Sequence, residues 1–158
     1  MDDLELLKQW YEGIRVSNIR HRLAKVHYAR INKLLGVCVI VSTTFVGMTV
    51  FVNLSGIEKQ LQILIGVISV LATILASLQT FFNYSDLSEK HNLVAIKYGS
   101  LRREIDEYLI SHKSNDALKS LFQSIRPRWD QIDQEAPALP DRIFRRGNEI
   151  ITSRPLKI

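Results

Sequence analysis

The sequence predicts an all-α membrane protein, in which a two-transmembrane helical hairpin has long helices that extend into a cytosolic helical bundle. Residues 34–54 carry no charged side chain across 21 positions, and residues 60–85 carry none across 26. At about 1.5 Å per helical residue, 21 residues reach roughly 31 Å, which is close to the ~30 Å hydrocarbon core of a bilayer. We therefore expect two membrane-spanning helices, residues 34–54 and 60–83, joined by a short turn at 55–59.

The charged residues lie outside this hairpin and are unevenly distributed around it. The chain of 158 residues carries a net charge of +5, and its pI is about 9.5. Residues 13–57 contain no acidic side chain, while six basic residues precede the first span: Arg15, Arg20, Arg22, Lys25, Arg30 and Lys33. Basic residues close to a membrane entry are retained on the cytoplasmic side, so we expect both termini to be cytoplasmic. The basic run lacks the interleaved aromatic residues that stack on bases, which argues against nucleic acid as a partner.

Residues 1–33 are predicted to form a basic N-terminal cytosolic helix. Its apolar stripe begins with helical spacing at Leu4, Leu7, Tyr11 and Ile14. The positions that would continue this stripe are polar: Asn18, His21 and Lys25. A second apolar stripe follows with a shifted phase: Val16, Ile19, Leu23 and Val26. Because a glycine inside a helix costs about 1 kcal/mol relative to alanine, we expect a bend or break between Gly13 and Asn18.

The second span is predicted to continue into the cytosol, without a break, as a helix over residues 84–111. Spacings of three and four residues alternate there in an unbroken heptad pattern: Tyr84, Leu87, His91, Val94, Tyr98, Leu101, Ile105 and Tyr108. We expect this stripe to be an assembly seam. Counted backward in the same register, the span presents mostly small or hydroxylated residues: Gly66, Val70, Thr73, Ser77 and Thr80. A straight helix drifts by about 20° per heptad, so the two halves share a face only if the helix supercoils.

A further helix is predicted at residues 114–135, followed by a tail at 136–158. Ser114 has the side chain of an N-cap residue. Pro127 is expected to kink or restart the helix, because proline lacks a backbone N–H and clashes with the preceding turn. The Ala- and Pro-rich residues 136–140 then end regular structure. The sequence leaves open whether the basic tail packs as a short helix or stays loose.

Small and hydroxylated side chains in the two spans form the candidate site within the membrane. Lipid tails are as apolar as leucine, so small faces are what let membrane helices approach closely. We expect five residues to line a pore or to pack closely: Thr43, Gly47, Thr73, Ser77 and Thr80. Neither span contains Asp, Glu, His, Lys or Arg, which argues against an ion-coupled transporter.

No arrangement of residues in the sequence predicts an enzyme, a cofactor site or a metal site. The single cysteine, Cys38, lies within the first span, and the four histidines, at 21, 27, 91 and 112, are far apart in the sequence. Neither a phosphate-binding glycine loop nor a nucleophile elbow is present. His91, on the assembly seam, is most simply a hydrogen-bonded interface histidine, with a pH- or ligand-sensing role as the alternative.

Several short motifs follow one another from the end of the second span onward. They are Phe82-Asn83-Tyr84-Ser85, Glu89-Lys90-His91, Tyr98, Leu101-Arg102-Arg103-Glu104 and Glu135-Ala136-Pro137. This series resembles the SLATT family of two-transmembrane proteins, whose pattern is an aromatic-Asn end on the second span, an acid with His, a Tyr, a Leu-x-Arg-Glu run and a late acid-Ala-Pro. The likeness covers most of the chain and implies a single SLATT-like unit over residues 1–158.

The resemblance further implies a membrane effector of a bacterial anti-phage system that acts by abortive infection. Members of that family look like pore formers, often encoded beside sensor proteins or enzymes that make nucleotide second messengers. Two helices cannot enclose a pore, so we expect a homo-oligomer in the inner membrane that permeabilises or depolarises the lipid bilayer when triggered. The alternative is a membrane-anchored helical adaptor that recruits a soluble partner. Small-molecule transport by a paired hairpin is disfavoured by the missing intramembrane charge.

Overall fold

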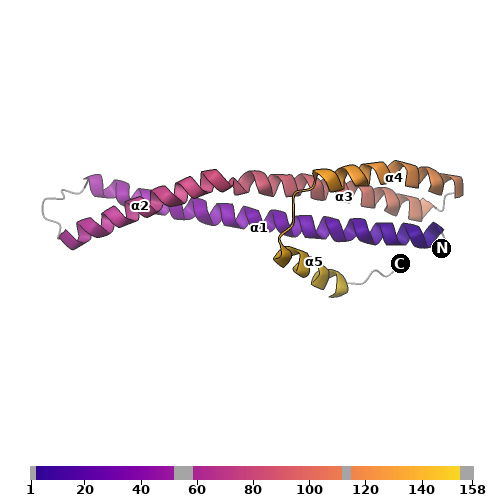
Figure 1. The fold of residues 1–158 in the computed structure, drawn as a ribbon, viewed down its shortest axis with the longest axis horizontal. Coiled ribbons are helices and arrows are strands. Elements are labelled where there is room, and N and C mark those ends of the chain that lie inside the picture. Colours follow the sequence, from indigo (N-terminus) through magenta and orange to yellow (C-terminus); the bar gives the residue numbers. More distant parts are fainter. Residues whose placement is uncertain (1–2, 52–58, 112–114, 154–158) are drawn as a thin grey trace. The chain divides into compact units, whose positions relative to one another are not determined.

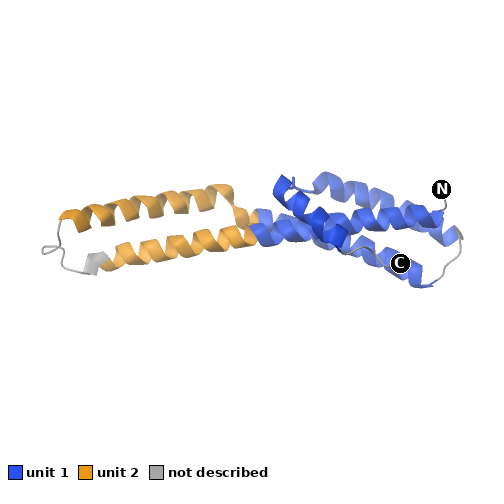
Figure 2. Ribbon diagram, turned by 90° about the horizontal axis from the view of Figure 1, so that it is seen from below, with its two compact units in different colours: residues 1–27, 87–158 blue, residues 28–86 orange. Residues whose placement is uncertain are grey.

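The computed structural model of the chain describes residues 3–51, 59–111 and 115–153, which are helical apart from short connections. The helices are α1 (Asp3–Phe51), α2 (Lys59–Phe82), α3 (Tyr84–Ser111), α4 (Asn115–Glu135) and α5 (Asp141–Ser153), labelled in Figure 1. The prediction of an all-α fold is confirmed for these residues. The chain divides into two compact units (Figure 2). We call residues 28–86 the hairpin unit and residues 1–27 with 87–158 the bundle unit.

In the hairpin unit, the last part of α1 and all of α2 run side by side in both ribbon views (Figures 1 and 2). The partly buried residues on α1 recur at heptad spacing: Leu35, Val39, Ser42 and Val46. Those on α2 do the same: Ile65, Ser69, Ala72, Ala76 and Gln79. The rings of Tyr28 and Tyr84 stack with centroids 6.0 Å apart at one end of the pair. The two helices therefore face each other along one stripe each.

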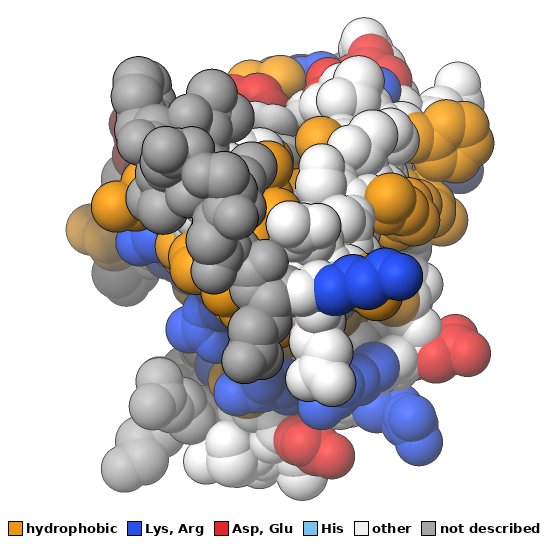
Figure 3. All heavy atoms as spheres, turned by 90° about the vertical axis from the view of Figure 1, so that its left-hand side faces the viewer, with side chains coloured by type: hydrophobic (Ala, Val, Ile, Leu, Met, Phe, Trp, Pro, Cys, Tyr) orange, Lys and Arg blue, Asp and Glu red, His pale blue; other side chains and the backbone are white. Residues whose placement is uncertain are grey.

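Many large hydrophobic side chains are exposed on the rest of the hairpin. Its large hydrophobic side chains are between 40% exposed, at Leu78, and 81% exposed, at Phe81. Hydrophobic side chains reach the surface on both flanks of the hairpin when it is seen from its end (Figure 3). By length and composition, two helical stretches are able to cross a membrane: Asp3–Met48 and Lys59–Ser111.

The bundle unit packs the first part of α1 with α3, α4 and α5. Its hydrophobic core draws on three helices and consists of Leu7, Tyr11, Ile14, Val94, Tyr98, Leu101, Ile105, Tyr108, Leu118, Ile125 and Ile132. Along the hydrogen bonds between α1 and α3, residue numbers increase on one helix while they decrease on the other. The two helices are therefore antiparallel. The same holds for α3 and α4. Buried heptad positions on all three helices thus meet in one core.

α1 is a single unbroken helix, so the expected bend or break between Gly13 and Asn18 is wrong. A Cβ on Gly13 would lie 2.9 Å from Cη2 of Trp129, so this glycine makes room for an indole from α4. The stripe that includes Leu7 also continues without a phase shift, through buried Tyr11, Ile14, Asn18 and His21. Asn18 and His21 in this stripe are buried polar residues, which is why apolar periodicity alone predicts an interruption there.

The expected continuity of the second span with the cytosolic helix is also wrong, because α2 ends at Phe82 and α3 begins at Tyr84. Asn83 between them has φ 41°, in the left-handed region that asparagine occupies more readily than most residues. Its backbone N–H donates to the Gln79 carbonyl at 3.2 Å, and its Oδ1 accepts from the Asp86 N–H at 3.4 Å. The second bond is that of an N-cap residue. One asparagine therefore ends α2 and caps α3.

The break at Asn83 shifts the helical register by one residue. On α3 the buried stripe follows the predicted heptad positions, from His91 to Tyr108. On α2 the less exposed residues lie one position before each predicted one, as at Ala72 in place of Thr73. One residue is about 100° around an α-helix. The predicted small stripe on α2 is therefore turned away from α1. The prediction that one register continues from the second span into the cytosolic helix is wrong.

Other boundaries differ from the expected ones by a residue or lie outside the described residues. Lys59, assigned to the turn, is the first residue of α2, while 52–58 are outside the described ranges. α4 passes through Pro127 without a break, so the helix does not restart there. Ser114, the predicted N-cap, is likewise outside the described residues.

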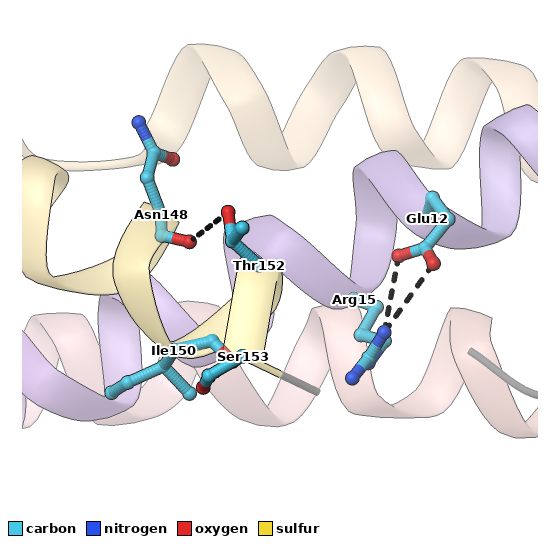
Figure 4. Close-up of polar contacts among 6 residues, drawn as sticks. All are labelled: Glu12, Arg15, Asn148, Ile150, Thr152 and Ser153. Atoms are coloured by element: carbon cyan, nitrogen blue, oxygen red, sulfur yellow. Dashed lines mark hydrogen bonds and ion pairs between the residues drawn. The ribbon is translucent and has the colours of Figure 1, made fainter. Parts of the chain in front are cut away.

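Within the C-terminal tail, α5 is a helix that packs on α1, which decides between the two alternatives for this segment. Ile143 and Gly147 are buried, and a Cβ on Gly147 would lie 2.6 Å from Cγ of Arg20. The Arg20 guanidinium lies 3.7 Å from the centroid of the Phe144 ring and donates to Oδ1 of Asn148 at 2.6 Å. Near the end of α5, two hydroxyls donate to backbone carbonyls of the preceding turn: Thr152 to Asn148 and Ser153 to Ile150 (Figure 4).

Replacing Asn83 by alanine is expected to destabilise the chain by about 1–2 kcal/mol, because alanine removes the cap and disfavours the left-handed region. Asn83→Gly should cost less, since glycine adopts a positive φ freely. Thermal unfolding of the purified chain in detergent micelles, followed by circular dichroism, measures both. An alanine variant as stable as the unmodified chain would contradict this account.

Candidate functional site

The five residues predicted to line a pore or pack closely all lie exposed on the hairpin. Thr73, Ser77 and Thr80 follow one another on a single face of α2, and each hydroxyl donates to a backbone carbonyl one turn earlier at 2.9–3.1 Å. On α1, the Thr43 hydroxyl donates to the Val39 carbonyl at 2.8 Å in the same way. These hydroxyls are thus satisfied within their own helices.

Among the residues whose side chains are described, none on this face is buried. A Cβ on Gly47 would meet no atom within 4 Å, so the hairpin itself does not require a glycine there. Ala72, next to Thr73, is instead the buried contact of α2, at 3% exposed. The small and hydroxylated face is therefore left for lipid, for water or for another hairpin.

The assembly seam predicted on α3 is occupied by the chain itself. Six of its eight residues are buried in the bundle unit, at 0–7% exposed: His91, Val94, Tyr98, Leu101, Ile105 and Tyr108. Leu87 is partly buried in the same unit, and Tyr84 is partly buried in the hairpin unit beside Tyr28. The seam thus joins helices of one chain, and its use between chains stays a prediction.

Four buried polar residues interrupt the apolar contact of α1 with α3, and we call them the polar layer: Asn18, His21, Ser88 and His91. Nδ2 of Asn18 donates to the Ala95 carbonyl, and the Ser88 hydroxyl donates to the Lys25 carbonyl at 3.1 Å. Nδ1 of His21 and Nδ1 of His91 lie 2.9 Å apart. Every one of these bonds crosses from one helix to the other, so the polar layer fixes how α1 and α3 align.

The two imidazoles are held in their neutral forms. Burial, the neighbouring His91 and the Arg20 charge lower the pKa of His21 to about 4, and burial lowers the pKa of His91. A hydrogen bond between two Nδ1 atoms requires a proton on one and a lone pair on the other, which neutral rings of opposite tautomer supply. Among the described residues, no group of three or more His, Cys, Asp or Glu gathers to hold a metal ion.

A second buried polar contact joins α3 to α4. Tyr98 is 2% exposed, and its hydroxyl donates to Oδ1 of Asp133. Burial and the adjacent carboxylate raise the pKa of Tyr98 above its ordinary value. Lys97 hydrogen-bonds Glu135 on the same pair of helices, which lowers the pKa of that carboxyl. The latter pair is exposed and therefore contributes little to stability.

Several residues from the short motifs quoted above make these contacts between elements. Asn83 caps α3, His91 meets His21, Tyr98 meets Asp133, and Glu104 accepts from Arg128 at 2.6 Å. Sequence reasoning missed the partners His21 and Asp133, together with Asn18. The spacing of Asn18 and His21 continues the Leu7–Ile14 stripe and is the signal that could have found them.

Tyr98→Phe is expected to lower the stability of the chain by about 1–2 kcal/mol, because the partly buried hydrogen bond to a carboxylate is lost. Urea unfolding in detergent micelles, followed by tryptophan fluorescence, measures the loss. Asp133→Asn keeps an acceptor oxygen and should cost less. In the Asp133→Ala background the Tyr98→Phe change should cost much less than in the unmodified chain, and strict additivity of the two changes would rule out the contact.

The described residues thus offer two features with functional potential: an unoccupied small and hydroxylated face on the hairpin unit, and the polar layer inside the bundle unit. Both follow from the residues of this chain alone. The chain matches no protein-family model, no curated protein and no solved structure.

Proposed function

We propose that the chain is a membrane effector whose hairpins assemble into a pore that permeabilises or depolarises the bacterial inner membrane when triggered. The observation that carries this proposal is the small and hydroxylated face of the hairpin, whose five residues are all exposed in the part of the chain that the structure describes. The apolar surface around this face is a second observation that supports the proposal.

The apolar surface supports insertion of the hairpin into lipid. Among the hairpin residues whose side chains are described, Ala72 alone is buried, while large hydrophobic residues on both helices are 40–81% exposed. Soluble monomers rarely expose continuous apolar patches larger than a few hundred Å². A bilayer solvates such a surface, and its backbone groups are satisfied within the two helices. The basic residues that precede the first span favour cytoplasmic termini.

The face of Thr73, Ser77 and Thr80 supports assembly of several hairpins. Two helices cannot enclose a channel, so a pore needs more than one copy. Small side chains let helices from neighbouring copies approach closely. The hydroxyls bond to their own helix at 2.9–3.1 Å, so they tolerate a helix contact in a closed state and face water in an open one.

The biological setting rests on the resemblance to the SLATT family. It supports abortive infection as the outcome, with growth arrest or death of an infected cell. A sensor protein or second-messenger-producing enzyme encoded nearby would supply the trigger.

A membrane-anchored adaptor is the second candidate, and one observation favours it. Leu93 and Ile96 lie three residues apart on α3 in the bundle unit and are 50% and 55% exposed. A soluble partner could bury them. An adaptor does not need a small face on α2, so the two candidates respond differently to substitutions there.

Leucine at Thr73, Ser77 and Thr80 together is expected to reduce depolarisation at least tenfold, because the larger side chains block close approach and remove the hydroxyls. A potential-sensitive dye in bacteria that express the chain with its genomic neighbours, after triggering, measures the effect. The matched control replaces three exposed leucines of α2, Leu64, Leu71 and Leu78, by valine, and it should depolarise like the unmodified chain.

Two results would count against the proposal. If the leucine variant depolarises as fast as the unmodified chain, at equal membrane abundance, this face does not line or assemble a pore. The adaptor then remains as the candidate function. An unmodified chain that neither depolarises the membrane nor slows growth after triggering would remove the pore function itself.

A further inference from the structure

His21 and His91 occupy buried positions in the stripes that join α1 to α3. They are 4% and 0% exposed, and their ring centroids lie 5.1 Å apart. Buried stripe positions in helix pairs are ordinarily apolar, and polar residues there cost stability while fixing register. A pair of titratable rings at such a position makes the helix contact depend on protons.

We infer that the His21–His91 pair is a proton-sensitive latch, closed when both imidazoles are neutral and opened when both are protonated. The Nδ1 atoms lie 2.9 Å apart. In the neutral pair, Nδ1–H of one ring donates to the lone pair of the other ring, whose own proton is on Nε2. A single added proton preserves the bond but buries a charge. A second one places two N–H groups and two positive charges against each other.

Groups on several helices lie around the pair or next to its neighbours. From α1, Arg20 lowers the pKa of His21 further, since it is also a cation. From α3, the Tyr98 ring lies 5.7 Å from the His21 ring, and its hydroxyl is bonded to Asp133 of α4. From α5, Asn148 is neutral and accepts from Arg20.

The other bonds of the polar layer do not titrate near neutral pH. Asn18 donates to the Ala95 carbonyl, and Ser88 donates to the Lys25 carbonyl. They align α1 with α3 at any pH in this range, whereas the imidazole pair between them adds cohesion only while it is neutral. Opening would uncover buried seam residues of α3 such as Leu101 and Ile105.

The latch is independent of whether the hairpins form a pore, and this separates its test from that of the proposed function. If they do, protons entering through a permeabilised membrane would acidify the cytoplasm and favour the open form. The signal for opening would then be produced by the pore itself.

The direction of the pH effect follows from the lowered folded-state pKa values. The unfolded histidines take up protons near pH 6.5 and His21 in the bundle only near pH 4, so stability present at neutral pH is lost as pH falls below about 6.5. For His21 alone, the unfolding equilibrium constant should rise about fourfold at pH 6 and about thirtyfold at pH 5, relative to pH 8. His91 adds to this rise.

The test is urea unfolding of the full chain in detergent micelles at pH 8, 7, 6 and 5, followed by the fluorescence of Trp10 and Trp129. The double variant His21→Asn/His91→Asn keeps side-chain hydrogen bonding without titration, and its unfolding should lose most of the pH dependence. The matched control, His27→Asn, changes an exposed histidine of α1 and should retain the full effect. A double variant with the pH dependence of the unmodified chain would overturn the latch.

A second variant and a second measurement keep the latch testable if the asparagine pair does not fold. His21→Leu/His91→Leu restores an apolar seam and should be folded and nearly insensitive to pH from 8 to 5. In the unmodified chain, NMR titration of ¹³C-labelled histidines should place the midpoint of His21 near pH 4 and that of His91 below its ordinary value. Ordinary midpoints near 6.5 for both His21 and His91 would disprove the latch regardless of the variants.

Discussion

The architecture depends on one constraint: α1 is a single helix with a single buried stripe, and two different helices have to pack along it. Residues of this stripe alternate by three and four from Leu7 to Val46, and each is buried or partly buried. In the bundle unit its partner is α3, and in the hairpin unit its partner is α2. A repeat of 3.5 residues keeps such a stripe facing its partner only if the helices supercoil. Asn83, with its left-handed backbone conformation, separates α2 from α3, so these two partner helices need not share one register.

The side chains of the stripe differ in polarity along α1, according to the groups that they contact. Apolar residues from Leu7 to Ile14 meet the core of the bundle, whereas Asn18 and His21 meet polar groups on α3. In the hairpin, the stripe continues through partly buried residues from Leu35 to Val46, and α2 buries the small residue Ala72. Buried hydrogen bonds discriminate between alignments more strongly than apolar contacts, which tolerate sliding. The polar layer therefore sets the alignment of α1 with α3 in the bundle unit.

Much of the fold could be predicted from the sequence, since hydrophobic periodicity and the absence of charge report directly on helices of this length. The two apolar stretches and the stripe from His91 to Tyr108 are examples. Periodicity failed where a buried position is polar, as at Asn18 and His21, because it treats polarity as exposure. It failed at Asn83 because a single left-handed residue has no periodic signature. The partnership of Tyr98 with Asp133 depends on how α4 docks, which spacing along one helix does not contain.

The hydroxyl bonds along α2 have a mechanical consequence. Thr73, Ser77 and Thr80 each donate to a carbonyl that also belongs to the backbone ladder of the helix. Sharing a carbonyl in this way weakens the ladder and bends helices. Three such residues within eight positions concentrate compliance on one side of α2. The part of the α2 backbone ladder that these hydroxyls weaken thus lies along exposed residues, apart from the buried Ala72.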